Sequence, residues 1–176
     1  MRGFVVGVIA TLVVLVCGAF AVSRLGLYPI GADNPPGAVE RMLAMRAMDV
    51  YADRHKPDGD NPVSPTAAAL TAGALKYEAH CALCHGGAAA RISPLQNRFS
   101  PPAPQLINRV PHDPDAWIFW VTKHGVRMTG MPAWDTVLTD EQIWKIVAFI
   151  KHSGKLTPDV QQYWDSVAAT PASATS

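Results

Sequence analysis

The five residues Cys81-Ala82-Leu83-Cys84-His85 constrain this chain more than any other feature. Two thiols separated by two residues, with an imidazole directly after the second thiol, match the pattern for covalent attachment of a c-type haem. Each thiol can add to a vinyl group of the porphyrin and form a thioether, and the adjacent imidazole can bind the iron from one side. The motif predicts a fold built around a haem that Cys81 and Cys84 attach, with His85 as the proximal iron ligand.

Two other sites use a pair of cysteines at this spacing. A structural zinc site needs four ligands, which a second Cys or His pair usually completes, and the only other cysteine here is Cys17 in an apolar N-terminal run. A thioredoxin-like redox pair lies where a strand meets a helix, whereas this motif follows an alanine-rich segment, 67–79, that reads as helix. The lack of a second ligand pair and the helical context of the motif therefore both favour the haem interpretation.

The opposite face of the iron decides the chemistry, because a methionine thioether raises the potential and suits electron transfer. Met131 is the favoured distal ligand and follows His85 by 46 residues. Gly130 lets the backbone approach closely, and Pro132 stiffens the loop after the ligand.

Other candidates for the distal position stay open. Met128 is the fallback, and His112 and His124 are the histidine alternatives. Either methionine could instead fill the haem pocket without binding iron. Three further methionines, spaced three apart on an expected helix, are interpreted as a packing face: Met42, Met45 and Met48.

An apolar run of 19 residues, 4–22, contains no charge and no proline. It is long enough to span a hydrocarbon core of ~30 Å as a helix. We interpret residues 1–24 as an uncleaved membrane anchor. A cleaved signal peptide is the rival interpretation, since Ala19-Phe20-Ala21 resembles a cleavage site, although the run is long for a signal h-region of ~7–15 residues.

The remaining sequence divides into three segments. Residues 25–65 form a proline-rich arm, an amphipathic helix over 38–52 with Val39, Leu43, Ala47 and Val50 on one side, and a linker. Residues 66–155 form the haem domain. Residues 156–176 form a short helix and a flexible tail.

Several residues in and next to the haem domain predict where its helices begin and end. Ser64-Pro65 predicts an N-cap and first helical residue, and Asp113-Pro114 predicts the same for a later helix. Gly125 fits the end of that later helix. Residues 139–142 predict a capping box for the last core helix.

At this point residues 66–151 resemble the small bacterial class I c-type cytochromes. Gly73 and Tyr77 resemble the family's Gly-x-x-x-aromatic N-terminal helix, and residues 130–134, Gly-Met-Pro-Ala-Trp, resemble its axial-ligand loop. The resemblance implies an all-α, cytochrome c-like fold, with helices wrapped around one covalently bound haem and the N-terminal helix crossing the close-packed C-terminal helix. Its partners there would be Ile143, Ile146, Val147, Phe149 and Ile150.

The expected function is that of a membrane-anchored monohaem electron carrier, not an enzyme, with redox proteins as donor and acceptor. Because c-type haem is attached outside the cytoplasm, the haem domain would face the periplasm from the bacterial inner membrane. Alternatives are a haem subunit fixed in a larger respiratory or dehydrogenase complex, and an open-face haem with peroxidase-like or gas-binding chemistry. The net charge of +1 indicates no nucleic-acid partner, and no small-molecule substrate is expected.

Overall fold

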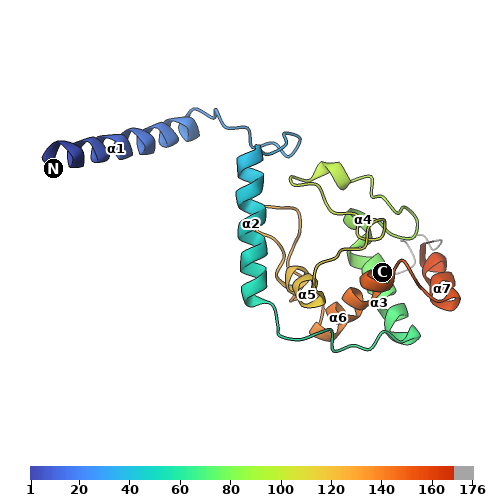
Figure 1. The fold of residues 1–176 in the computed structure, drawn as a ribbon. Coiled ribbons are helices and arrows are strands. Elements are labelled where there is room, and N and C mark those ends of the chain that lie inside the picture. Colours follow the sequence, from blue (N-terminus) through green and yellow to red (C-terminus); the bar gives the residue numbers. More distant parts are fainter. Residues whose placement is uncertain (169–176) are drawn as a thin grey trace. The chain divides into compact units, whose positions relative to one another are not determined.

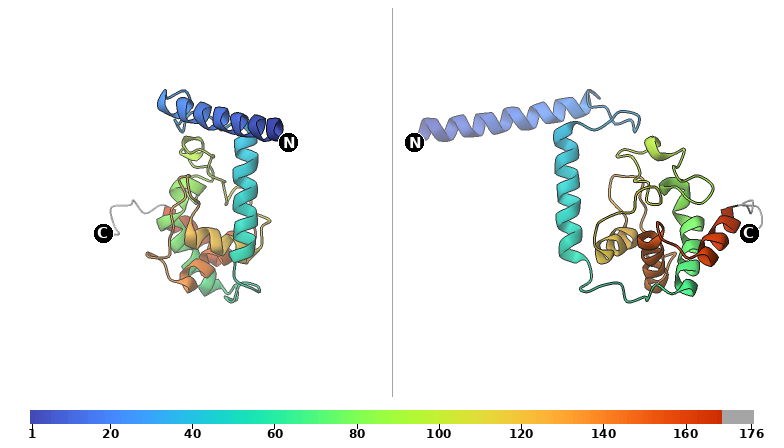
Figure 2. Two further views of the ribbon diagram at one scale, coloured as in Figure 1. Left: turned by 90° about the vertical axis from the view of Figure 1, so that its left-hand side faces the viewer. Right: turned by 45° about the vertical axis from the view of Figure 1, so that its right-hand side comes forward.

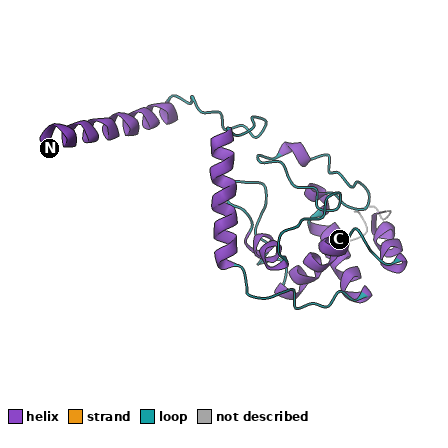
Figure 3. Ribbon diagram, in the orientation of Figure 1, coloured by secondary structure: helices purple, strands orange, loops and turns teal. Residues whose placement is uncertain are grey.

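The computed structural model describes residues 1–168 and divides into two compact units, Met1–Asn34 and Pro35–Ser176. Regular structure in the described part is entirely helical, with loops between the helices (Figure 3). The prediction of an all-α fold is therefore confirmed for these residues. The flexible tail expected at the C-terminus, residues 169–176, lies outside the described part of the chain.

The first unit is dominated by helix α1, Arg2–Arg24, which has 23 residues. At ~1.5 Å per residue it is about 35 Å long, enough to cross a hydrocarbon core of ~30 Å. None of its residues is buried against protein. By length and composition α1 is a candidate membrane span near the N-terminus.

The second unit contains the other helices (Figure 1). In chain order they are α2 (Ala38–His55), α3 (Ala67–His80), α4 (Ala82–His85), the short 3₁₀ helix η1 (Gln96–Arg98), α5 (Asp115–His124), α6 (Asp140–His152) and α7 (Pro158–Ala168). Long loops connect α4 to α5 and α5 to α6.

The core of this unit forms where α3 crosses α6. Gly73 makes the close approach possible, because a Cβ at this position would lie 2.1 Å from the Lys145 carbonyl oxygen. Tyr77, one turn later, is fully buried, and its ring centroid lies 5.4 Å from that of Phe149. The apolar residues of α6 expected at this crossing are all at most 2% exposed: Ile143, Ile146, Val147, Phe149 and Ile150.

Two further helices complete the core. In α5, Phe119 stacks on Trp144 of α6, with ring centroids 4.1 Å apart. In α7, Trp164 is fully buried and meets Phe149 edge to face. Helix α7 lies along α3 in both Figure 1 and Figure 2, so the last described helix is part of the packed fold.

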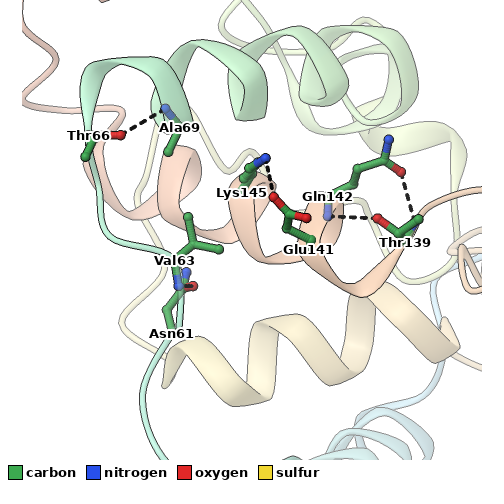
Figure 4. Close-up of polar contacts among 8 residues, drawn as sticks. All are labelled: Asn61, Val63, Thr66, Ala69, Thr139, Glu141, Gln142 and Lys145. Atoms are coloured by element: carbon green, nitrogen blue, oxygen red, sulfur yellow. Dashed lines mark hydrogen bonds and ion pairs between the residues drawn. The ribbon is translucent and has the colours of Figure 1, made fainter.

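The helix ends show which expected caps form (Figure 4). The capping box at Thr139 and Gln142 is present, with both reciprocal hydrogen bonds. The prediction for α3 was wrong by two residues: Thr66 is the N-cap, and its hydroxyl accepts the Ala69 N–H at 3.2 Å. The prediction for α5 was wrong by one residue, since the helix begins at Asp115 after Pro114. Pro114 is itself the N-cap, its carbonyl oxygen accepts the Trp117 and Ile118 N–H groups, and no side chain caps this end of the helix.

Helix α2 packs on α5 through one edge. Ala52 is fully buried there, and the rings of Tyr51 and His55 lie 5.6 and 6.4 Å from that of Trp120. The helix is three residues longer than predicted and ends at His55. Its predicted apolar side points elsewhere: Val39 is 66% exposed and Leu43 is 60% exposed.

Candidate haem site

The motif residues lie on a single turn of helix. The Cys84 and His85 N–H groups both donate to the Cys81 carbonyl oxygen, at 3.1 and 2.9 Å. Residues at i, i+3 and i+4 share one face of a helix, so the two thiols and the imidazole project to the same side. Neither Cys81 nor Cys84 is in a disulfide. The local fold thus presents both thiols and the imidazole together, as attachment of one haem requires.

The imidazole of His85 is oriented by a residue of the following loop. Its Nδ1 lies 2.7 Å from the Pro104 carbonyl oxygen. Since a carbonyl can only accept, Nδ1 carries the proton and Nε2 keeps its lone pair for a metal. Burial lowers the pKa of His85, against a smaller opposing effect of the Pro104 hydrogen bond. The neutral imidazole, which is the metal-binding form, is therefore favoured.

Cys81 is buried, and burial is the main cause that raises the pKa of its thiol to about 12. Because zinc binding and thiol–disulfide exchange both need the thiolate, this environment disfavours them. No group of three or more His, Cys, Asp or Glu side chains able to hold a metal ion occurs among the described residues. The donor set fits two thioethers and an imidazole iron ligand.

Side chains that the sequence analysis did not single out hold the backbone around the motif. The buried amide of Gln105 donates to the Cys84 carbonyl oxygen at 3.1 Å and accepts the Ser93 N–H at 2.6 Å. The Ser93 hydroxyl in turn donates to the Leu83 carbonyl oxygen. From α3, the Tyr77 hydroxyl donates to the Gly86 carbonyl oxygen at 2.7 Å. The Leu83 and Cys84 carbonyl groups are therefore held from the loop after α4, and the Gly86 carbonyl group is held from α3.

Glu78 links the motif to the last helix. Its carboxylate accepts the Ala88 N–H at 2.7 Å and the indole N–H of Trp164 in α7. Above that indole lies Arg91, with its guanidinium carbon 5.5 Å from the ring centroid. One acidic side chain thus joins α3, the residues after the haem motif and α7. Sequence reasoning missed this role because a single glutamate in a helix has no local pattern that marks it.

The predicted distal-ligand loop is braced by its own side chains. Gly125 ends α5 with φ +66°, and the Val126 N–H donates to the Met131 carbonyl oxygen at 3.1 Å. Between them, the Thr129 hydroxyl donates to the Val126 carbonyl oxygen at 2.7 Å and accepts the Met131 N–H at 3.1 Å. A ligand on a loop of this kind loses little further conformational entropy when it binds iron.

The two methionines differ in their surroundings. Met131 is half-buried, whereas Met128 is 90% exposed, with φ +62°, at the tip of the loop. Of the other candidates, His112 and His124 are both exposed. Met131 is thus the candidate most sheltered from solvent.

One loop contacts both segments that carry the predicted iron ligands. Between α4 and α5, Pro104 and Leu106 hydrogen-bond to His85, the latter through its N–H to the His85 carbonyl oxygen at 3.1 Å. In the same loop Phe99 abuts Gly130, where a Cβ would lie 2.3 Å from the ring. A side chain at position 130 would therefore require either the Phe99 ring or the loop that carries Met131 to move.

Trp134 follows the ligand loop and is also held. Its N–H donates to the Lys123 carbonyl oxygen at 3.0 Å, and its ring lies 5.1 Å from that of His80. His80 directly precedes the haem motif. The pKa of His80 is lowered, first by burial and then by the charge of Lys76.

Comparison with known proteins identified a family that matches this part of the chain. Residues 68–150 match the family model described as cytochrome C oxidase, cbb3-type, subunit III. Searches among curated proteins and among solved structures each found no match. The matched segment runs from the first turn of α3 almost to the end of α6 and contains the Cys81–His85 motif and the loop of the predicted distal ligand Met131. The resemblance to small bacterial cytochromes is confirmed, and residues 68–150 of this chain are a c-type cytochrome domain.

Proposed function

We propose that this protein is a membrane-anchored monohaem cytochrome that passes single electrons between redox proteins on the periplasmic side of the bacterial inner membrane. The observation that carries the proposal is the Pro104 hydrogen bond, which leaves Nε2 of His85 free beside the two thiols. A bound haem supplies a reversible one-electron change between ferric and ferrous iron. The chain supplies its attachment, orientation and enclosure.

Each site residue has a distinct role in this proposal. Cys81 and Cys84 would hold the haem covalently, each through a thioether formed by addition of its S–H across a vinyl group. His85 would hold the iron through Nε2, and Met131 would hold it through its sulfur. Gln105 and the other backbone contacts around His85 resist movement of the imidazole when the charge of the site changes, which keeps the reorganisation small.

Two features support the location. Helix α1 is long and apolar enough to span a membrane, and attachment of c-type haem outside the cytoplasm would place the second unit in the periplasm. Tethering confines the haem domain to the membrane plane and raises its effective concentration near membrane partners.

A second candidate is a haem subunit fixed in a larger respiratory complex. The description of the matched family, a subunit of a cytochrome oxidase, favours it. Size analysis of gently solubilised membranes separates the two: a free carrier migrates alone, whereas a fixed subunit comigrates with other redox proteins and keeps a constant stoichiometry to them.

The ligand assignment is tested by visible spectra of the holoprotein, oxidised and reduced, with and without carbon monoxide. The wild type should show the weak charge-transfer band of methionine-ligated ferric haem and no shift with carbon monoxide. In Met131→Ala the band should disappear, carbon monoxide should bind, and the midpoint potential should fall. Met128→Ala is the matched control and should behave as the wild type.

If Met128→Ala loses the band and binds carbon monoxide while Met131→Ala behaves as the wild type, then Met128 is the distal ligand. If the wild type itself binds carbon monoxide, then the iron has an open face, and the electron-carrier proposal gives way to gas-binding or peroxidase-like chemistry.

A further inference from the structure

Helix α2 leaves a narrow apolar stripe uncovered, with the charged residues Glu40, Arg46 and Arg54 beside it on the helix. Val39, Leu43, Ala47 and Val50 follow one another at spacings of four, four and three, so they form one stripe along the helix. The contact with α5 is made by another side of the helix, which carries Tyr51, Ala52 and His55. Within the stripe Val39 and Leu43 are exposed, and the neighbouring Met42 is 61% exposed. The contact with the haem domain therefore does not account for this stripe.

The exposed side has the composition of a contact surface. A shallow depression runs along it and reaches the edge that packs on α5, because its lining includes Tyr51 and His55 as well as Leu43, Ala47, Val50, Arg46 and Arg54. Contiguous apolar surface on an otherwise soluble unit commonly marks a binding site for protein or membrane. Arginines beside an apolar stripe can lay their methylene stems along it and reach anionic groups with their guanidinium ends.

The position of α2 in the chain indicates which surface covers it. Helix α1 ends at Arg24 and α2 begins at Ala38, so residues 25–37 alone separate the stripe from the candidate span. This connection reaches at most about 45 Å when fully extended. It also carries exposed apolar side chains suited to the headgroup region, including an aromatic one: Leu25, Leu27, Tyr28 and Ile30.

We propose that α2 lies on the lipid surface, with the Val39–Val50 stripe in the boundary between headgroups and acyl chains and with Arg46 and Arg54 at anionic headgroups. The edge that carries Tyr51, Ala52 and His55 then holds the haem domain on the side of α2 away from the lipid. Helix α2 is thereby a second membrane contact that restricts how the haem domain can turn toward its partners. The inference rests on the proposed anchoring through α1.

The test uses full-length holoprotein in nanodiscs of phosphatidylethanolamine and phosphatidylglycerol. A spin label is placed at one position at a time, Leu43→Cys, Ala44→Cys or Leu12→Cys, in a Cys17→Ser background. Accessibility to oxygen, which concentrates in lipid, is compared with accessibility to a water-soluble nickel complex. The visible spectrum of each sample verifies that the haem domain has formed.

The label at Leu43 should become several-fold less accessible to nickel in nanodiscs than in detergent, while the label at Ala44, on another side of the helix, should stay accessible. The label at Leu12 reports on α1. If Leu12 is protected and Leu43 is not, then the lipid contact of α2 is wrong and the anchor stands. If Leu12 is accessible too, the proposed anchoring fails and this inference fails with it.

A substitution gives an independent readout. With the label at Val39→Cys, adding Leu43→Glu should restore nickel accessibility, because a carboxylate in the stripe opposes burial in an anionic lipid surface. Ala44→Glu is the matched control and should leave the label protected. Protection of the stripe that occurs in native membranes but not in nanodiscs would overturn the lipid proposal in favour of a protein partner.

Discussion

At the scale of single residues, Gly73 decides how closely α3 and α6 approach. The nearest atoms to a Cβ at this position belong to the backbone of Lys145 and to the Cβ of Phe149, at 2.1 and 3.0 Å. Backbone atoms cannot rotate away as the end of a flexible side chain can. Any side chain at position 73 therefore has to move one helix relative to the other, which would disturb Tyr77 and the motif that follows it.

We expect Gly73→Ala to destabilise the holoprotein by about 1–3 kcal/mol, the usual cost of overpacking a core. Gly154→Ala is the matched control, since the nearest atom to its Cβ would be Val110 Cγ2 at 3.9 Å, an ordinary contact. Denaturant unfolding followed by circular dichroism measures both. Equal midpoints for the two variants would show that the helices separate at little cost.

His80 is expected to make stability depend on pH. Its pKa in the folded protein lies below the usual 6.5, so the unfolded chain binds more protons between the two values. The contribution is complete above about pH 6.5 and is lost as the pH falls toward the folded pKa. His80→Gln should therefore lose less stability than the wild type on acidification through this window.

Thermal melting between pH 7.5 and 5 measures this difference. His112→Gln provides a control at an exposed histidine. If His80→Gln and wild-type protein lose stability in parallel, then burial against Trp134 does not discriminate between the two protonation states of His80.

At the scale of elements, α7 belongs to the fold although the matched family segment ends at residue 150. Trp164 is fully buried, lies against Phe149 and donates its indole N–H to Glu78. Because Glu78 also holds the Ala88 N–H, α7 acts on the residues after His85 through one carboxylate. The last helix thus stabilises the haem motif as well as the core.

Trp164→Ala should reduce the free energy of unfolding by about 3–5 kcal/mol, as expected for removing a buried aromatic side chain. Tyr163→Ala, at a partly exposed neighbour on the same helix, should change it by only about 0.5 kcal/mol. Guanidinium unfolding of the holoprotein distinguishes them. Similar losses in both variants would mean that the cost comes from α7 helicity and not from the core contact.

At the scale of the whole molecule, the described chain combines a candidate span with a small haem domain. A domain of this size has a limited apolar core, and a buried porphyrin adds a large apolar surface on which helices can pack. Folding and haem attachment should therefore be coupled. Both processes involve the buried thiol of Cys81 and the oriented imidazole of His85.

We expect the Cys81→Ala, Cys84→Ala double variant, prepared without haem, to be poorly folded. Far-ultraviolet circular dichroism should show reduced helix content, and thermal melting should lack a cooperative transition. Cys17→Ser, which removes the remaining cysteine from the N-terminal helix, should attach haem and melt cooperatively. Near-native helix content with cooperative melting in the double variant would refute the coupling.

The features that could be predicted from the sequence depend on residues close together in the chain. The haem motif places both thiols and His85 on one helical turn, and the capping box joins Thr139 to Gln142. The prediction of α1 as a candidate membrane span likewise depends only on the residues of that helix. Local spacing determines such features, because each involves one helix or one of its ends.

The tertiary structure decided the features that join distant segments. Pro104 orients His85 from 19 residues away, and Trp164 reaches Glu78 across 86 residues. No periodic pattern marks such partners, since each contributes a single group whose position depends on how whole helices pack. For the same reason the sequence determined that α2 has an apolar stripe, whereas only the packing of its Tyr51–His55 edge on α5 decided that this stripe is left exposed.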